Sequence, residues 1–238
     1  WEKLEKGLLT KKEIRKMGFP YSPRLVDREL IITQGTIKGV HYALKNGICF
    51  NVAGGTHHAY ADRGEGFCLL NDQAIAAGYL LRNQLAGKIV VVDLDVHQGN
   101  GTAKIFQNEP RVFTFSMHGK KNYPLYKEVS DLDIALEDHA DDKTYLDLLD
   151  RYLNTILDQH QPDFIFFQSG VDVLSTDKLG RLGLTIRGTY ERDKLVLTLC
   201  HNNKIPCQVS MGGGYSERLS NIIEAHANTY RLAQQIYF

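Results

Sequence analysis

Cysteines and long apolar runs are both scarce in this chain of 238 residues. The four cysteines lie apart among apolar neighbours and form no C-x-x-C pair, which excludes a disulfide scaffold and indicates buried, reduced thiols. No segment approaches the ~20 consecutive apolar residues of a membrane span, and the N-terminal residues lack the apolar core of a secretory signal. We therefore expect a cytoplasmic protein without a membrane span.

The chain also carries no net charge, since Lys plus Arg and Asp plus Glu both number 28. Without a basic field it should not hold polyanions non-specifically, so direct nucleic-acid binding is not expected. A hydrophobic fraction of 43% excludes disordered and collagen-like classes. No internal repeat and no Pro/Gly/Ser-rich linker interrupts the chain, so we expect one domain over residues 1–238. No feature of the sequence sets an oligomeric state.

Short β-rich runs alternate with segments of helical spacing, which is typical of parallel β-α units. The predicted strands are residues 48–52, 89–94, 112–116, 164–168 and 207–211. The predicted helices are residues 24–44, with an interruption near Gly35, and residues 69–84, 143–158 and 217–235. The pattern predicts an α/β domain.

Two of these runs, IVVVDLD and FIFFQSG, are apolar on both faces. A strand tolerates this when helices cover both sides of its sheet, so the sheet should be central and mostly parallel. Glycines gather close to strand ends, in GGTHHA, GEGF, HQGNG and MGGGY. Ligands bind at the carboxyl edge of such sheets, and the chemistry should be sought there.

The segment around Asp93, Asp95 and His97 follows a run of valines. If the strand persists, these three side chains share one face. Two adjacent buried carboxylates are costly without a cation, and a divalent metal provides one. The alternative is a set of helix caps or a salt-bridged strand end. Nitrogen and oxygen ligands suit zinc, although ferrous iron can use the same donors.

Catalytic zinc takes three protein ligands and leaves one position open. If Asp93 is needed elsewhere, the third ligand should come from a second strand end. Asp172 is the candidate, because it follows the apolar run FIFFQSG. Its alternative role is a turn residue that caps the next helix.

The tandem pair His57 and His58 follows another strand. A glycine-bent loop can turn both rings toward one cavity, where one would act as a general base and the other as a proton donor. The alternatives are a separate metal site or a solvated loop.

Tyr215 ends the glycine run MGGGY, which can present its hydroxyl to an oxyanion. Gly66 and Phe67 are candidates for an aromatic wall of a narrow substrate tunnel. The alternatives are a core tyrosine and a core phenylalanine.

In order and spacing, GGTHHA, GEGFCLLNDQAIAA, VDLDVHQGNGT, SGVDVLSTDKLG and GGGY resemble the histone deacetylase superfamily, most closely its class IV branch and bacterial relatives. The resemblance runs from about residue 24 to the end. It implies an arginase/deacetylase fold, with an eight-stranded, mostly parallel sheet between helices and zinc at its carboxyl edge. Family domains begin upstream of Trp1, so we expect the N-terminal part of the domain to be missing.

The resemblance also implies site roles. The implied zinc ligands are Asp95, His97 and Asp172, and the implied catalytic residues are His57, His58 and Tyr215. Asp93 matches the carboxylate that orients the first histidine, and Asn100 stands beside the second, as in the class IV pattern. A neutral partner makes His58 the less basic ring. We assign His58 as general base and His57 as electrostatic or acid partner. Asp93, Asp95, His97 and Ser116 match parts of a structural potassium site.

These roles predict a zinc-dependent amidohydrolase that uses metal-activated water to remove acetyl or longer acyl groups from lysine side chains of a protein. One alternative substrate is an acetylpolyamine or another small acylated amine, whose cationic product would need an acidic rim. The other alternative is a non-catalytic module that binds acyl-lysine.

Overall fold

The computed structural model describes residues 1–238. Its centre is one six-stranded sheet, all parallel, in the order β1-β6-β5-β2-β3-β4. The strands are β1 (Ile48–Asn51), β2 (Ile89–Asp93), β3 (Val112–Gly119), β4 (Leu132–Leu136), β5 (Phe164–Gln168) and β6 (Cys207–Ser210). The predicted α/β class is confirmed, and the four cysteines are free thiols, as expected.

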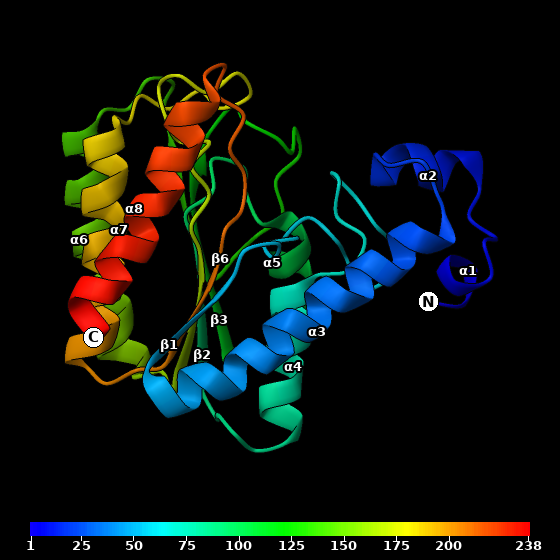
Figure 1. Ribbon diagram of the computed structural model, residues 1–238, viewed down its shortest axis with the longest axis horizontal. Coiled ribbons are helices and arrows are strands. Elements are labelled where there is room, and N and C mark those ends of the chain that lie inside the picture. The colour runs from blue at the N-terminus through cyan, green and yellow to red at the C-terminus, as the bar shows by residue number, and fades with distance from the viewer.

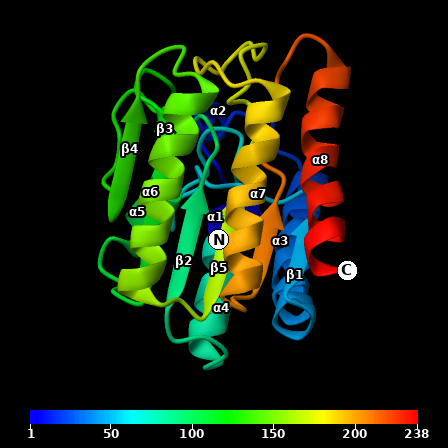
Figure 2. The same ribbon diagram turned by 90° about the vertical axis from the view of Figure 1, so that its left-hand side faces the viewer.

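Helices cover both faces of this sheet (Figures 1 and 2). They are α1 (Glu2–Glu5), α2 (Lys11–Met17), α3 (Pro23–Asn46), α4 (Asp72–Arg82), α5 (Asn100–Phe106), α6 (Asp142–His160), α7 (Ile186–Asn202) and α8 (Leu219–Tyr237). In Figure 1, α3, α4 and α5 lie on one side of the sheet and α6, α7 and α8 on the other, while α1 and α2 project beyond the start of α3. No helix has the length and apolar character needed to cross a membrane.

The central strand β2 shows how the sequence builds two cores. Val90 and Val92 belong to the core on the side of α6–α8, whereas Ile89 and Val91 belong to the core on the side of α3–α5. All five residues of the strand are buried. The strand is therefore apolar at its first four positions, 89–92, as the sequence indicated, and only Asp93 at its carboxyl end is polar.

Two expectations for individual elements were wrong. Helix α3 continues past Gly35, where a Cβ atom would lie 3.2 Å from Nδ2 of Asn51, so this glycine permits close packing and causes no break. The sheet has six strands where the resemblance implied eight. Strand β4 was not predicted, because it lies at the sheet edge and most of its residues are only partly buried.

Helix α7 was also missed, and its inward face explains why. Arg192 and Asp193 lie there, fully buried, with an Nη2–Oδ1 distance of 2.7 Å. This ion pair interrupts the apolar stripe from which helices were read.

Candidate active site

The segments that follow β1, β2, β5 and β6 meet at the carboxyl edge of the sheet and line a cleft of about 750 Å³. This is the edge at which the glycine clusters predicted the site. Parallel strands bring together chain segments that are far apart in sequence.

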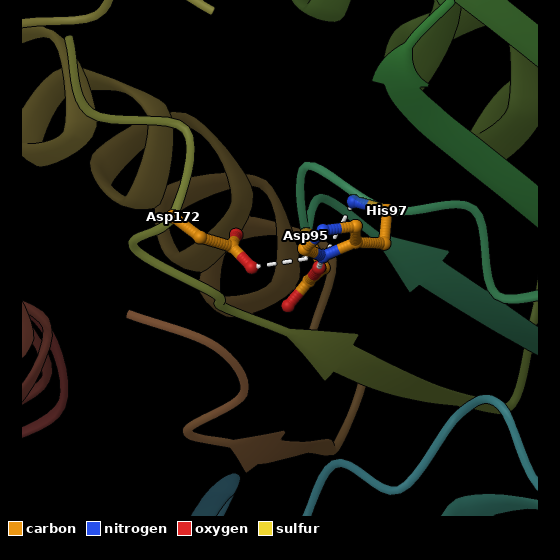
Figure 3. A group of neighbouring side chains, drawn as sticks. All are labelled: Asp95, His97 and Asp172. Atoms are coloured by element: carbon orange, nitrogen blue, oxygen red, sulfur yellow. Dashed lines mark hydrogen bonds and ion pairs between the residues drawn. The ribbon is translucent and has the colours of Figure 1, made fainter. Parts of the chain in front are cut away.

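The floor of the cleft is formed by Asp95, His97 and Asp172. Figure 3 shows that these three side chains point toward one another. One ligand atom from each lies within 4.8 Å of the others. His97 Nδ1 is 3.0 Å from Asp95 Oδ1 and 3.2 Å from Asp172 Oδ2. Donors about 2.1 Å from a tetrahedral metal are about 3.4 Å apart, so these separations are close to those of a zinc site.

Asp172 provides the test of whether a cation fits here. Its side chain is fully buried, and Oδ1 accepts a hydrogen bond from Val96 N at 2.9 Å. Oδ2 accepts no hydrogen bond, because the His97 Nδ1 atom 3.2 Å away is close enough for an ion pair but is not aligned to donate. Burial and the nearby Asp95 carboxylate raise the pKa of Asp172 to about 7. An orphaned carboxylate oxygen beside a second carboxylate and an imidazole is a donor set that a divalent metal satisfies.

The loop after β2 orients Asp95 and His97, although the strand itself ends at Asp93. The strand therefore does not continue to His97, which was the condition on which the shared face was predicted. Alternation nevertheless persists, because Leu94 and Val96 are fully buried in the core on the side of α6–α8. The apolar side chains thus turn the polar ones toward the cleft.

Buried Arg192 supports the two segments that hold the metal ligands. Its guanidinium donates to the carbonyl oxygen of Gly170 at 2.6 Å and to that of Leu94 at 3.2 Å. Each carbonyl lies within two residues of a ligand aspartate, so one side chain from α7 fixes both segments.

His57 is buried between two carboxylates. Its Nδ1 lies 2.7 Å from Asp93 Oδ2, and its Nε2 lies 3.9 Å from Asp95 Oδ1. Burial alone would lower the pKa of His57, but Asp93 and Asp95 outweigh it and raise the pKa to about 9.

His58 is also buried, but its partner is neutral. Its Nδ1 lies 2.6 Å from Asn100 Oδ1, and its ring centroid is 4.1 Å from that of His57. Burial, followed by the charge of His57, holds the pKa of His58 well below its usual value. The two adjacent imidazoles therefore prefer different charge states at neutral pH.

Tyr215 forms part of the cleft wall and is 46% exposed. Its backbone N–H donates to Asp177 Oδ2 at 2.6 Å. Burial and the charges of Asp95 and Asp172 raise the pKa of its hydroxyl, which therefore stays protonated and able to donate.

Gly66 and Phe67 also line the cleft, and neither is a core residue. A Cβ atom on Gly66, which has φ +57°, would lie 2.9 Å from the His58 ring. Phe67 is 60% exposed and packs edge-on against Phe19, with ring centroids 5.3 Å apart. The alternative of a core phenylalanine is thus wrong.

Ser116 pairs in register with Asp93 across β2 and β3, and its hydroxyl lies 3.0 Å from His118 Nδ1. Both the serine and His118 are buried. The potassium site that includes Ser116 stays a prediction.

Three basic residues at the mouth of the cleft were not predicted: Arg28, Lys121 and Arg181. Apart from the metal-ligand carboxylates and the histidines, they are the only titratable charged side chains that line it. Lys121 and Arg181 reach the same oxygen, Asp138 Oδ2, at 3.3 and 3.1 Å. These residues come from three distant segments, so no local motif marks them.

The chain matches the family model of the histone deacetylase domain over residues 2–230. It is 45% identical over 231 residues to an uncharacterized protein of Picosynechococcus sp., covering 97% of this chain and 77% of that protein. It is 33% identical over 216 residues to histone deacetylase B of Dictyostelium discoideum, covering 84% and 49% of the two chains. It is 30% identical over 192 residues to histone deacetylase 2 of Arabidopsis thaliana, covering 79% and 50%. The chain thus spans about half the length of these two deacetylases.

Among solved structures, an acetylpolyamine aminohydrolase from Burkholderia pseudomallei is similar in fold, with a TM-score of 0.71 and 24% identity. The match covers 84% of this chain and 60% of the other. The chain therefore shares the arginase/deacetylase fold that the sequence motifs implied.

Proposed function

Because the chain belongs to the histone deacetylase family, we propose that it is a metal-dependent amidohydrolase that removes acetyl or longer acyl groups from lysine side chains. The observation that carries this proposal is the convergence of Asp95, His97 and Asp172 at the floor of a cleft that also holds two buried histidines and Tyr215. This combination provides metal ligands, a base and a hydrogen-bond donor around one space.

Asp95, His97 and Asp172 would hold the metal, and we propose zinc, with ferrous iron as the alternative. When bound, such an ion supplies Lewis-acid polarisation of the acyl carbonyl and lowers the pKa of a water molecule.

His58 is the proposed general base. Its low pKa keeps it neutral at pH 7, so it can accept the proton of an attacking water. The hydrogen bond to Asn100 Oδ1 requires the ring proton on Nδ1 and leaves Nε2 free for this task.

His57 is the proposed acid partner. Its pKa of about 9 keeps it protonated at neutral pH, and its Nδ1–H donates a hydrogen bond to Asp93 Oδ2. The positive ring would stabilise negative charge as it develops on the substrate and donate a proton to the amine that leaves.

Tyr215 would donate its hydroxyl hydrogen bond to the carbonyl oxygen. This oxygen gains negative charge as water attacks the carbon, and the bond to nitrogen then breaks to give a carboxylate and an amine. A donor aimed at the oxygen stabilises this transition state more than the neutral amide.

The charge of the mouth favours acyl-lysine over acetylated polyamines. Acyl-lysine is neutral at its reacting end, whereas an acetylpolyamine keeps ammonium groups that would approach Arg28, Lys121 and Arg181. For an uncompensated charge each such approach at about 4 Å costs on the order of 1 kcal/mol in water, and the carboxylates of Glu29 and Asp138, which pair with these basic residues, reduce it. An acidic rim, which the cationic alternative needs, is not present in this cleft.

The test is an assay of the zinc-loaded protein on fluorogenic peptides that carry acetyl- to long-chain acyl-lysine, beside acetylated polyamines. We expect hydrolysis of at least one acyl-lysine and no preference for polyamines, with Asp172→Ala as the inactive control. Faster cleavage of polyamines would favour the small-amide alternative. If no amide were cleaved at stoichiometric zinc, the protein would be a binding module instead.

A further inference from the structure

The proposed base, His58, depends on the orientation of the neutral side-chain amide of Asn100. Asn100 Oδ1 lies 2.6 Å from His58 Nδ1, while Asn100 Nδ2 donates to Tyr60 Oη at 2.9 Å and to Glu65 Oε1 at 3.3 Å. If this amide were reversed, its NH₂ group would face Nδ1 of His58. The ring proton would then have to sit on Nε2, and His58 could not accept a proton from water.

The two acceptors of the Asn100 amide differ in what they enforce. The Tyr60 hydroxyl donates to Glu128 Oε1 at 3.1 Å while it accepts from Asn100, but a hydroxyl can rotate and donate to a reversed amide instead, so Tyr60 opposes reversal only by the loss of that one bond. The Glu65 carboxylate, when ionised, only accepts, so it must face the NH₂ group. Of the two partners, Glu65 is therefore the one that selects the orientation.

Glu65 is held ionised although it is only 7% exposed. Lys16 Nζ lies 2.8 Å and Arg63 Nε 3.2 Å from its Oε2, and the Tyr123 hydroxyl donates to its Oε1 at 2.8 Å. Burial alone would raise the pKa of Glu65, but these three partners outweigh it and lower the pKa.

The backbone around Glu65 is anchored as well. Its own N–H and C=O pair with Cys68, at 2.9 Å in both directions. The next two residues, Gly66 and Phe67, donate to the carbonyl oxygens of Lys16 and Met17 at the end of α2. The carboxylate thus sits on a fixed loop, which a group that orients another side chain requires.

We propose that Glu65 is a positioning residue: it fixes the Asn100 amide, which in turn fixes the protonated nitrogen of His58. Glu65 would orient His58 indirectly, through Asn100, whereas Asp93 orients His57 by direct contact. The inference rests on the proposed function only for its catalytic consequence, because the orientation of the amide is a property of the protein alone.

The first experiment is ¹⁵N NMR of the histidine rings in the zinc-loaded wild-type protein. We expect His58 to carry its proton on Nδ1. A proton on Nε2 overturns the proposal, and this measurement needs no variant to fold. Tyr60→Phe, which removes the permissive acceptor, should keep the Nδ1-protonated form.

The second experiment replaces Glu65→Gln, whose amide can accept or donate with a similar shape. We expect His58 to populate both tautomers and kcat to fall about 10-fold, with KM within about twofold and bound zinc unchanged. The matched control is Asp62→Asn, because Asp62 is an exposed carboxylate of the same loop that bonds only Arg63. This control should leave tautomer and kcat unchanged.

The third experiment is a rescue. In Asn100→Asp/Glu65→Gln, a carboxylate faces His58 directly and no longer needs residue 65 to orient it. We expect kcat to recover at least threefold over Glu65→Gln alone, which a merely structural role for Glu65 does not predict. A double variant no better than the single one overturns the proposal.

The outcomes separate this inference from the proposed function. If the wild-type protein cleaves no amide, the proposed function fails, while the NMR of wild type and Glu65→Gln still reports whether Glu65 sets the tautomer. If the wild type is active but Glu65→Gln changes neither tautomer nor kcat, only the inference about Glu65 fails.

Discussion

The floor and the mouth of the cleft are built in different ways. At the floor, Asp95 and Asp172 are buried, and each accepts a hydrogen bond from a backbone N–H. At the mouth, the side chains of Lys121 and Arg181 are 59% and 54% exposed and share the carboxylate of Asp138. Fixed, buried groups suit chemistry, whereas exposed groups on loops bias which substrate approaches. Changes at the floor should therefore affect turnover, and changes at the mouth should affect substrate preference.

Asp172→Asn should have the largest effect. It removes one of two carboxylates from the metal set, so we expect little bound zinc and a loss of kcat/KM on the order of 1000-fold, above the 10- to 100-fold typical of residues that only orient a ligand. Metal analysis and the peptide assay measure both. Asp177→Asn is the matched control for zinc content alone, since Asp177 lies outside the triad and accepts from backbone N–H groups of Leu179, Gly180 and Tyr215. Normal zinc content in Asp172→Asn would remove Asp172 from the ligand set.

Tyr215→Phe, in the wall beside the floor, should separate chemistry from metal binding. The phenyl ring keeps the wall but cannot donate to the carbonyl oxygen, so we expect full zinc occupancy and a drop in kcat of about 100-fold. Steady-state kinetics and metal analysis on one preparation provide the comparison. Unchanged turnover would reject the role of Tyr215 as donor.

The contrast between floor and mouth also explains which site residues could be predicted from the sequence. The three residues of the floor were predicted because each follows an apolar strand, and the alternation of side chains indicated where Asp95 and His97 point. Glu65 and Arg181 were not found. Their positions depend on loop paths and on partners such as Lys16 and Asp138, which are distant in sequence. Strand β4 and helix α7 were missed because their apolar periodicity is weak. In β4 the exposed sheet edge admits polar residues, and in α7 a buried ion pair replaces apolar residues.

Burial near the floor should also make folding sensitive to acid. His226 on α8 is buried, its Nδ1 has no hydrogen-bond partner, and burial followed by the charge of Arg192 lowers its pKa from 6.5 to about 4. Below pH 6.5, His226 binds a proton in the unfolded chain but stays neutral in the folded protein until the pH approaches 4. The stability that His226 contributes is thus complete above pH 6.5 and is lost as the pH falls toward 4.

The measurement is urea unfolding at pH 7 and pH 4.5. Over this interval the free energy of unfolding should fall by about 2 kcal/mol more in the wild type than in His226→Gln. This estimate follows from about 1.4 kcal/mol per pH unit for one proton. His201→Gln, at an exposed histidine on α7, should behave as the wild type. If the free energy of unfolding fell equally in His226→Gln and in the wild type, His226 would have the same pKa in the folded and unfolded states.

Arg181→Glu should have the smallest effect and should change only the preference between substrates. Reversing one exposed charge at the mouth alters the energy of a nearby ammonium by about 1 kcal/mol, so kcat/KM for an acetylated polyamine should rise about fivefold relative to an acetyl-lysine peptide. Zinc content should not change, and the gain should shrink at 1 M salt, because exposed charges are screened. Lys45→Glu makes the same charge change at the far end of α3 and should leave the ratio unaltered. A fall in turnover on every substrate, with the ratio constant, would mean that Arg181 supports the floor and that the two regions are not separable.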